Sequence, residues 1–237
     1  MINWYEKVYH FNQYNFDVWV EEQASLIPPT SRVLDVGAGA GRYRLLFQHC
    51  EYYTQDFCQE PTTIGKYTDI DYISDIIAIP VNDASFDVIL CTAVLEHVPE
   101  PVQAVKEMAR ILRQGGKLLL TAPLVSFLHQ EPYHFYGGYT PYWFKKFLPE
   151  AGFEIDRISA NRGFFSLFGQ EANRFHALIT PWRLKNQGAL VYIGMSMLWL
   201  ITLPFLRGIF PLLGGFLDQL NLEHTATVGY FVSAIKR

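Results

Sequence analysis

The chain has 237 residues, of which 50% are hydrophobic and 16% aromatic, and its formal net charge is −4. This composition excludes a disordered protein, and the length is enough for one substantial core. The small negative charge and the lack of a long basic run argue against a nucleic-acid partner.

The first 27 residues are predicted to form one or two helices, because apolar residues recur at near-helical spacing before Pro28-Pro29. We expect residues 1–29 to act as an N-terminal helical cover. This cover either lies over a ligand pocket or packs on the sheet, and the pattern favours packing. The segment lacks an apolar core run, so we expect no signal peptide and a cytoplasmic protein.

A hydrophobic strand runs into a glycine-rich turn at VLDVGAGAGRY, residues 33–43. Gly37, Gly39 and Gly41 let the backbone turn sharply and approach a ligand, because they carry no Cβ. We expect a helix to begin near Gly41 and to point its N–H groups at that ligand. The segment therefore predicts a nucleotide-type site at the carboxyl end of a first parallel strand. Arg42 stands where a dinucleotide fingerprint requires its third glycine.

Four further segments follow in an order that alternates strand and helix patterns, which predicts a parallel sheet between residues 32 and 122. One is an aromatic-rich strand ending in Asp56, one a polar-apolar loop, one a strand followed by an LEH turn, and one a buried strand after a Gly-Gly turn. They read EYYTQDF (51–57), SDIIAIP (74–80), ASFDVILCTAVLEHVPEP (84–101) and ILRQGGKLLLTAP (111–123).

Taken together, the five segments resemble those of class I S-adenosylmethionine-dependent methyltransferases of the type 11 group. The resemblance implies an α/β, Rossmann-like, doubly wound fold with a mostly parallel seven-stranded sheet and an antiparallel last strand. It implies S-adenosyl-L-methionine as cofactor, with the glycine turn around the methionine portion, Asp56 on the ribose, and Asp75 and Ile76 at the adenine. The expected cofactor-binding residues are Asp35, Gly37, Ala38, Gly39, Asp56, Phe57, Asp75, Ile76 and Cys91.

The segment 124–144 follows the fifth strand, where acceptor pockets of this fold lie. Methyl transfer from a sulfonium needs positioning and exclusion of water, and it needs a base when the acceptor is a hydroxyl. We name His129 and His134 as base candidates and Tyr139 as a shaping or hydrogen-bonding candidate. The alternative is that each only satisfies the backbone of a long loop. His97, in the LEH turn, is interpreted as a structural or cofactor-edge residue.

Residues 151–158 and 227–236 are predicted to be the last two strands, and the resemblance implies that they pair antiparallel. Between them lies an apolar helical insertion, 161–226, in which residues 188–206 carry no charge. This stretch is long enough to span a membrane, but the chain must return to the sheet. Three alternatives stay open for it: insertion into one membrane face, contact with a second subunit, and burial against its own core.

The three cysteines, Cys50, Cys58 and Cys91, form no C-x-x-C pair. This argues for a reducing compartment and against both a disulfide framework and structural zinc. The acidic residues between 69 and 75 are interpreted as solvated loop carboxylates, and we predict no metal site.

We therefore expect a single domain over residues 1–237, with a cofactor-binding core at 30–160 and a last strand at 227–237. It would methylate a small, hydrophobic or lipid-like acceptor, and would contact a membrane or a second copy through 188–217. The alternatives are a non-catalytic scaffold of the same fold and an NAD-dependent oxidoreductase. Arg42 speaks against the oxidoreductase, and the intact glycine turn with Asp56 speaks against the scaffold.

Overall fold

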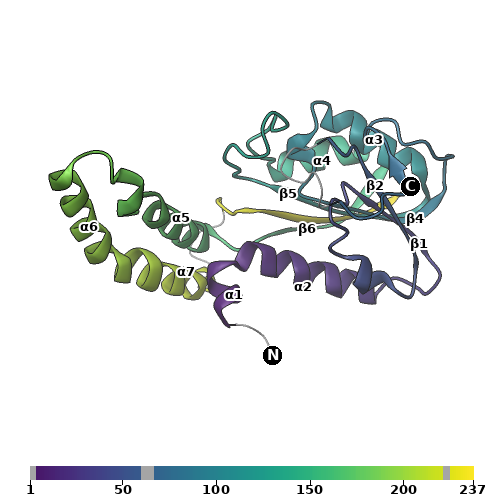
Figure 1. Ribbon diagram of the computed structural model, residues 1–237. Coiled ribbons are helices and arrows are strands. Elements are labelled where there is room, and N and C mark those ends of the chain that lie inside the picture. The colour runs from purple at the N-terminus through teal and green to yellow at the C-terminus, as the bar shows by residue number, and fades with distance from the viewer. Residues whose placement is uncertain (1–3, 60–66, 221–224) are drawn as a thin grey trace. The chain divides into compact units, whose positions relative to one another are not determined.

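The computed structural model describes residues 4–59, 67–220 and 225–237 (Figure 1). The chain divides into two compact units. The first unit comprises residues 16–160 and 229–237, and the second comprises the described parts of 1–15 and 161–228. The second unit thus contains the stretch that we predicted as an insertion, together with the start of the chain.

A seven-stranded mixed sheet forms the centre of the first unit. Its strands are β1 (Arg32–Val36), β2 (Glu51–Asp56), β3 (Tyr72–Ile73), β4 (Phe86–Thr92), β5 (Leu112–Pro123), β6 (Phe153–Ala160) and β7 (Gly229–Lys236). Their spatial order is β3-β2-β1-β4-β5-β7-β6. The pairings from β3 to β5 are parallel, and β7 runs antiparallel to both β5 and β6. The predicted fold class and the antiparallel pairing of the last two strands are confirmed.

Helices cover both faces of this sheet, because side chains along each buried strand point alternately to opposite sides. Leu34 packs in one core cluster with residues of α3 (Pro101–Ile111) and α4 (Pro141–Glu150). Its neighbour Val33 packs in a second cluster with Val20 and Ala24 of α2 (Phe11–Ser25). Figure 1 shows α3 and α4 on one side of the strands. The part of α2 that belongs to this unit therefore packs on the sheet, as the sequence favoured.

The glycine pair before the fifth strand lies inside β5, where we predicted a turn. Helix α3 begins with Pro101 at its first turn, where a missing N–H costs nothing, and ends at Ile111. The chain enters β5 at once, and the register between β4 and β5 shifts between Phe86 and Val88. Gly115 takes a φ of +75°, so glycine lets the strand absorb this irregularity without a break.

The helix that we expected to begin near Gly41 is not formed. The structure has a turn there, followed by the four-residue 3₁₀ helix η1 (Arg44–Phe47). Gly39 and Gly41 take φ values of +52° and +66°, outside the right-handed helical region. The buried side chains of Tyr43 and Phe47 then anchor the connection to the core before β2 begins. A long helix dipole is therefore not aimed at the glycine turn.

In the second unit, helices form a hairpin of residues 164–218, called here the apolar hairpin. One arm is α5 (Phe164–Leu178), and the other is α6 (Ala189–Leu203), the π-helical segment η4 (Pro204–Ile209) and α7 (Phe210–Asp218). The 3₁₀ helix η3 (Pro181–Leu184) lies in the turn, and α1 (Trp4–Tyr9) belongs to the same unit. A Cβ on Gly169 would lie 2.9 Å from the carbonyl oxygen of Phe210, so glycine permits this close approach of α5 and α7.

Asp218 closes the open end of the hairpin. Its Oδ2 accepts hydrogen bonds from the backbone N–H groups of Gly163 (3.0 Å) and Ser166 (3.1 Å), and its Oδ1 accepts one from Phe165 (3.1 Å). The last residue of α7 thereby satisfies amides at the start of α5 that have no partner within that helix. A carboxylate at this position is also favoured by the dipole of α5.

The α6 arm leaves its apolar surface uncovered. Every residue of α6 is at least partly exposed, and Leu190 reaches 87% exposure. The continuous helical run Ala189–Asp218 is, by length and composition alone, sufficient to cross a membrane. Within the described part of the second unit, no residue of α6 is therefore fully buried.

Replacing the closing carboxylate should loosen the hairpin. We expect Asp218→Ala to lower the free energy of unfolding of the second unit by about 1–2 kcal/mol, because three amides lose their acceptor. Hydrogen exchange of the amides at residues 163–166 should accelerate while exchange in β4 and β5 stays unchanged. Glu171→Ala is the control, since its ion pair with Arg174 is partly exposed. Equal exchange in both variants would contradict the capping role.

Candidate functional site

A cavity of about 480 Å³ opens at the carboxyl ends of the first strands of the sheet. Its size falls in the range of roughly 300–1,000 Å³ that is usual for small-molecule sites. One wall comes from the β1, β2 and β3 ends and the loop after β3, and the other from the LEH turn and the loop after β5. The lining residues are Gly37, Gly39, Gln55, Asp56, Phe57, Gln59, Tyr67, Ile73, Ser74, Asp75, Ile76, Ala93, Val94, His97, Val98, Pro99, Gln130, Tyr133 and Phe135.

The glycine turn after β1 forms the floor of this cavity. Gly37 takes a φ of +72°, and a Cβ there would collide with the side chain of Val94. Gly39 has open space where a Cβ would stand, but its φ of +52° still favours glycine. The N–H groups of Gly37 and Ala38 donate to the carbonyl of Gln55 at 2.8 and 3.0 Å. The turn is therefore fixed to β2 and presents little side-chain bulk to a ligand.

Asp56 stands at the end of β2 with its carboxylate at the cavity wall. Its Oδ2 accepts a hydrogen bond from the Gly39 N–H (3.0 Å), and its Oδ1 accepts one from the Cys58 N–H (2.9 Å). Two backbone donors thus fix the orientation of this carboxylate. A carboxylate has about four acceptor positions, so capacity remains for ligand hydroxyls.

A polar and an apolar residue adjoin each other after β3. Asp75 and Ile76 both line the cavity, and Asp75 Oδ1 accepts a hydrogen bond from the Ile77 N–H at 3.1 Å. Phe57, which directly follows β2, also lines the cavity. Its ring meets the ring of Tyr133 edge-on, with 5.0 Å between ring centroids. This end of the cavity can accept a hydrogen bond beside an apolar surface, which suits a flat heteroaromatic group.

The loop after β5 is tied down over the LEH turn, the 3₁₀ helix η2 (Leu95–His97). The N–H groups of Phe135 and Tyr136 donate to the Glu96 carbonyl at 2.9 and 3.2 Å, and His97 Nδ1 bonds to the Tyr133 carbonyl. Through these contacts the loop is fixed where Tyr133 and Phe135 line the cavity.

Three expected cofactor residues lie behind the cavity wall rather than on it. Asp35 is 2% exposed, and its carboxylate accepts a hydrogen bond from the Tyr52 hydroxyl. Burial raises the pKa of Asp35 from 3.8 to about 7, although the Tyr52 hydrogen bond opposes this rise. Ala38 adjoins the two lining glycines, and Cys91 is fully buried in the core, where burial raises the pKa of its thiol.

The base candidates gather beside the cavity. The rings of His129 and His134 have centroids 4.8 Å apart, and His129 lies 4.8 Å from His97, which does line the cavity. His134 Nε2 lies 3.2 Å from the Ser126 hydroxyl. Partial burial and the nearby His129 lower the pKa of His134, so its neutral form is favoured at neutral pH.

Tyr139 is placed away from these histidines in a structural role. Its side chain is 3% exposed, and its hydroxyl donates to the Leu95 carbonyl at 2.7 Å. Burial raises the pKa of this hydroxyl above its ordinary value. Its proton is therefore donated to the LEH turn, and Tyr139 is not among the residues that line the cavity.

Residues 34–120 match the family described as "Methyltransferase domain", and this range holds most of the lining residues just described. The family assignment rests on this match together with the strand order. Residues 34–120 therefore form a methyltransferase domain, on a sheet with Rossmann-like strand order. An NAD-dependent oxidoreductase, the third alternative from the sequence, is therefore set aside.

Two curated relatives illustrate the breadth of this family. The demethylmenaquinone methyltransferase of Renibacterium salmoninarum is 37% identical over 97 residues, covering 39% of this chain and 41% of the relative. The tRNA (carboxymethyluridine(34)-5-O)-methyltransferase alkbh8 of Xenopus tropicalis is 27% identical over 192 residues, covering 74% and 28%. The chain spans less than half the length of either. The names of these two relatives give different acceptors, demethylmenaquinone and a tRNA.

Among solved structures, the [4+2]-cyclase SpnF superposes with a TM-score of 0.55 at 17% identity, covering 92% of this chain and 80% of that one. This likeness concerns the fold. One fold can support different chemistries, so the activity depends on the residues of the site itself.

Two residues of the methyltransferase domain were not singled out from the sequence. Gln55 is 1% exposed and donates from Nε2 to the Ser74 carbonyl (2.7 Å), while its buried Oε1 has no hydrogen-bond partner in the described chain. Glu96 is 3% exposed, and burial raises its pKa from 4.5 to about 7. Periodicity could not find either residue, because only the tertiary contacts around them make them unusual.

The buried Asp35 should make stability fall as pH rises. Its carboxyl stays protonated in the folded state up to about pH 7 but ionises near pH 3.8 when unfolded. Between these values the folded state holds more protons, so the free energy of unfolding should fall with rising pH, by up to about 1.4 kcal/mol per pH unit. Asp35→Asn should remove this contribution. Urea unfolding at pH 5, 6 and 7 measures it.

The matched control is Asp69→Asn, because Asp69 is exposed. The free energy of unfolding of the wild type should fall relative to that of Asp35→Asn at each step from pH 5 to pH 7. A difference that is constant with pH would show that Asp35 is already ionised in the folded protein.

Proposed function

We propose that this chain transfers a methyl group from S-adenosyl-L-methionine to a small, hydrophobic or lipid-like acceptor. The observation that carries the proposal is the cavity wall, on which Gly37, Gly39, Asp56, Asp75 and Ile76 stand together. These residues come from three separate segments of the sequence, and the sequence alone predicts each of them to bind the cofactor.

Different residues around the cavity suit the ribose, the adenine and the methionine portion of this cofactor. Asp56, already oriented by two amides, would accept hydrogen bonds from the ribose hydroxyls. Asp75 would accept one from the adenine amino group, with Ile76 against the ring. The glycine turn would leave room for the methionine portion, and the unpartnered Oε1 of Gln55 offers an acceptor beside it.

When bound, this cofactor supplies a methyl group on a positively charged sulfur that an acceptor lone pair can displace directly. The chain's own residues would position the acceptor and exclude water, since no covalent nucleophile is needed. Tyr133 and Phe135, held by His97 and the Glu96 carbonyl, would shield the bound cofactor from water. The imidazole of His134, whose lowered pKa favours the neutral form, would take the proton from a hydroxyl acceptor.

The apolar hairpin supports a lipid-like acceptor presented at a membrane. Helix α6 carries no charged residue, and each of its residues is at least partly exposed. Between Glu171 and Asp218 there is no acidic residue, whereas the same stretch carries four basic ones, Arg174, Arg183, Lys185 and Arg207. Apolar surface with basic residues only is the combination that favours an anionic lipid surface.

Cofactor binding can be tested by calorimetric titration of S-adenosylhomocysteine into the purified protein. We expect binding that weakens by about 10- to 100-fold in Asp56→Ala, because two hydrogen bonds to a charged acceptor are lost. The Asp69→Ala variant should bind like wild type, because Asp69 is exposed and does not line the cavity. Absence of binding to folded wild-type protein would reject the enzyme and favour the scaffold alternative.

Membrane contact can be tested by flotation with vesicles of equal parts phosphatidylglycerol and phosphatidylcholine. Wild-type protein should float with them, and the double variant Leu190→Glu with Leu200→Glu should lose at least about tenfold in bound fraction. Leu45→Glu is the control, because Leu45 is 75% exposed in the first unit. Wild-type protein that stays with the soluble fraction and sediments as a dimer would instead assign the hairpin to a second copy.

A further inference from the structure

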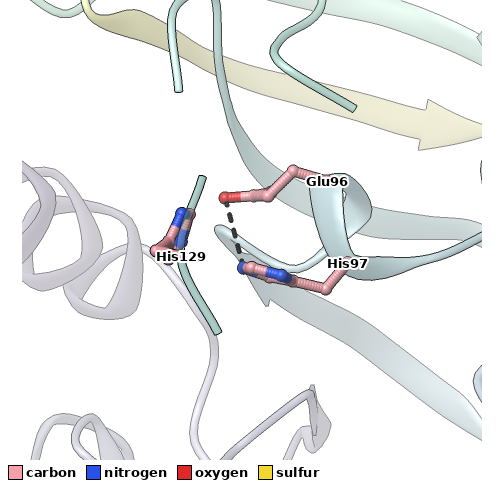
Figure 2. Close-up of side chains that lie close together, drawn as sticks. All are labelled: Glu96, His97 and His129. Atoms are coloured by element: carbon pink, nitrogen blue, oxygen red, sulfur yellow. Dashed lines mark ion pairs between the residues drawn. The ribbon is translucent and has the colours of Figure 1, made fainter. Parts of the chain in front are cut away.

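A compact cluster of Glu96, His97 and His129 lies beside the cavity, separate from the residues assigned to the cofactor. Each of the three offers one ligand atom, and these atoms all lie within 4.8 Å of one another. His97 Nε2 lies 3.9 Å from Glu96 Oε1. Figure 2 shows the carboxylate and the two imidazole rings gathered at one place, from the LEH turn and the loop after β5.

The hydrogen bonds of both rings fix which nitrogen carries the proton. His97 Nδ1 bonds to the Tyr133 carbonyl, and His129 Nδ1 lies 2.8 Å from the Phe127 carbonyl. A carbonyl oxygen can only accept, so each neutral ring must donate from Nδ1 and keep its lone pair on Nε2. Histidines that bind metals are typically held in this manner, with the other ring nitrogen donating to a backbone carbonyl.

Glu96 supplies an independent reason to expect a cation here. Its side chain is 4% exposed, and its Oε2 has no hydrogen-bond partner within the described parts of the chain. A buried carboxylate oxygen without a donor is costly, because it has lost water and gained nothing in return. A cation between this carboxylate and the neighbouring imidazoles would remove that cost.

We propose that Glu96, His97 and His129 bind one divalent transition-metal cation. Two imidazoles and one carboxylate are a ligand set suited to Zn²⁺ and neighbouring first-row ions rather than to Ca²⁺ or Mg²⁺. Three protein ligands leave at least one coordination position open, and His97 places the site at the cavity wall. His134, whose ring centroid lies 5.7 Å from that of His97, adjoins the site.

The site was not visible in the sequence as a metal motif. His97 and His129 lie far apart in the chain, and the spacing of Glu96 and His97 as neighbours matches no common ligand pattern. The loop after β5 must first return to the LEH turn, through the amides of Phe135 and Tyr136, before the three side chains meet.

The experiment uses full-length, tag-free protein that has been treated with chelator and dialysed. Zn²⁺ binding is measured by calorimetry, and Co²⁺ binding by the visible absorption that the ion acquires on entering a site of low coordination number. We expect one equivalent of either ion. Glu96→Gln and His129→Ala should each weaken binding by about tenfold or more, because each removes one ligand. His10→Ala, an exposed histidine in the second unit, should leave binding unchanged.

The proposal is overturned if wild-type protein binds neither ion, or if Glu96→Gln and His129→Ala bind as tightly as His10→Ala. His129 is exposed on its loop, so His129→Ala should melt like wild type without metal and decides the question even if Glu96→Gln does not fold. The titration with S-adenosylhomocysteine is carried out without metal. A failure of the metal site and a failure of the proposed function are therefore observed separately.

Discussion

The parallel pairing of β1 with both β2 and β4 is the constraint on which the site depends. In the observed register Val36 stands opposite Gln55 on one side and Cys91 on the other. The residues that follow these positions, Gly37, Asp56 and the start of the LEH turn, must therefore emerge at one edge of the sheet. Parallel strands always present their carboxyl ends together, so the fold brings functional groups from separate segments to one edge of the sheet.

Much of this arrangement could be predicted because the relevant signals are local. The glycine turn, Asp56 and the Asp75–Ile76 pair each lie at or just after the end of a strand, and the ends of these strands line the cavity. The helix expected at Gly41 was wrong because positive φ at Gly39 and Gly41 outweighs the general tendency of a helix to follow the first strand. Periodicity does not report the backbone conformation of glycine, which is compatible with both outcomes.

The acceptor side was harder to predict, and for a different reason. His129, His134 and Tyr139 are close in sequence, yet two of them join a cluster with His97 and the third is buried under Leu95. Their roles are set by where a long loop is fastened, and that depends on the carbonyl of Glu96, a residue unremarkable in the sequence. Such long-range backbone contacts produce no periodic pattern in the sequence. The sequence can therefore identify loop residues as candidates, but it cannot assign their roles.

The position of β7 has a consequence for how the protein is made. This strand lies between β5 and β6, and β6 is joined to the sheet through it. Because β7 follows the apolar hairpin in the chain, a ribosome completes the hairpin while β6 still lacks its partner. The growing chain must therefore shield a long apolar helix and an unpaired strand at the same time. The sheet can therefore close only after the hairpin has been made, when β7 inserts between β5 and β6.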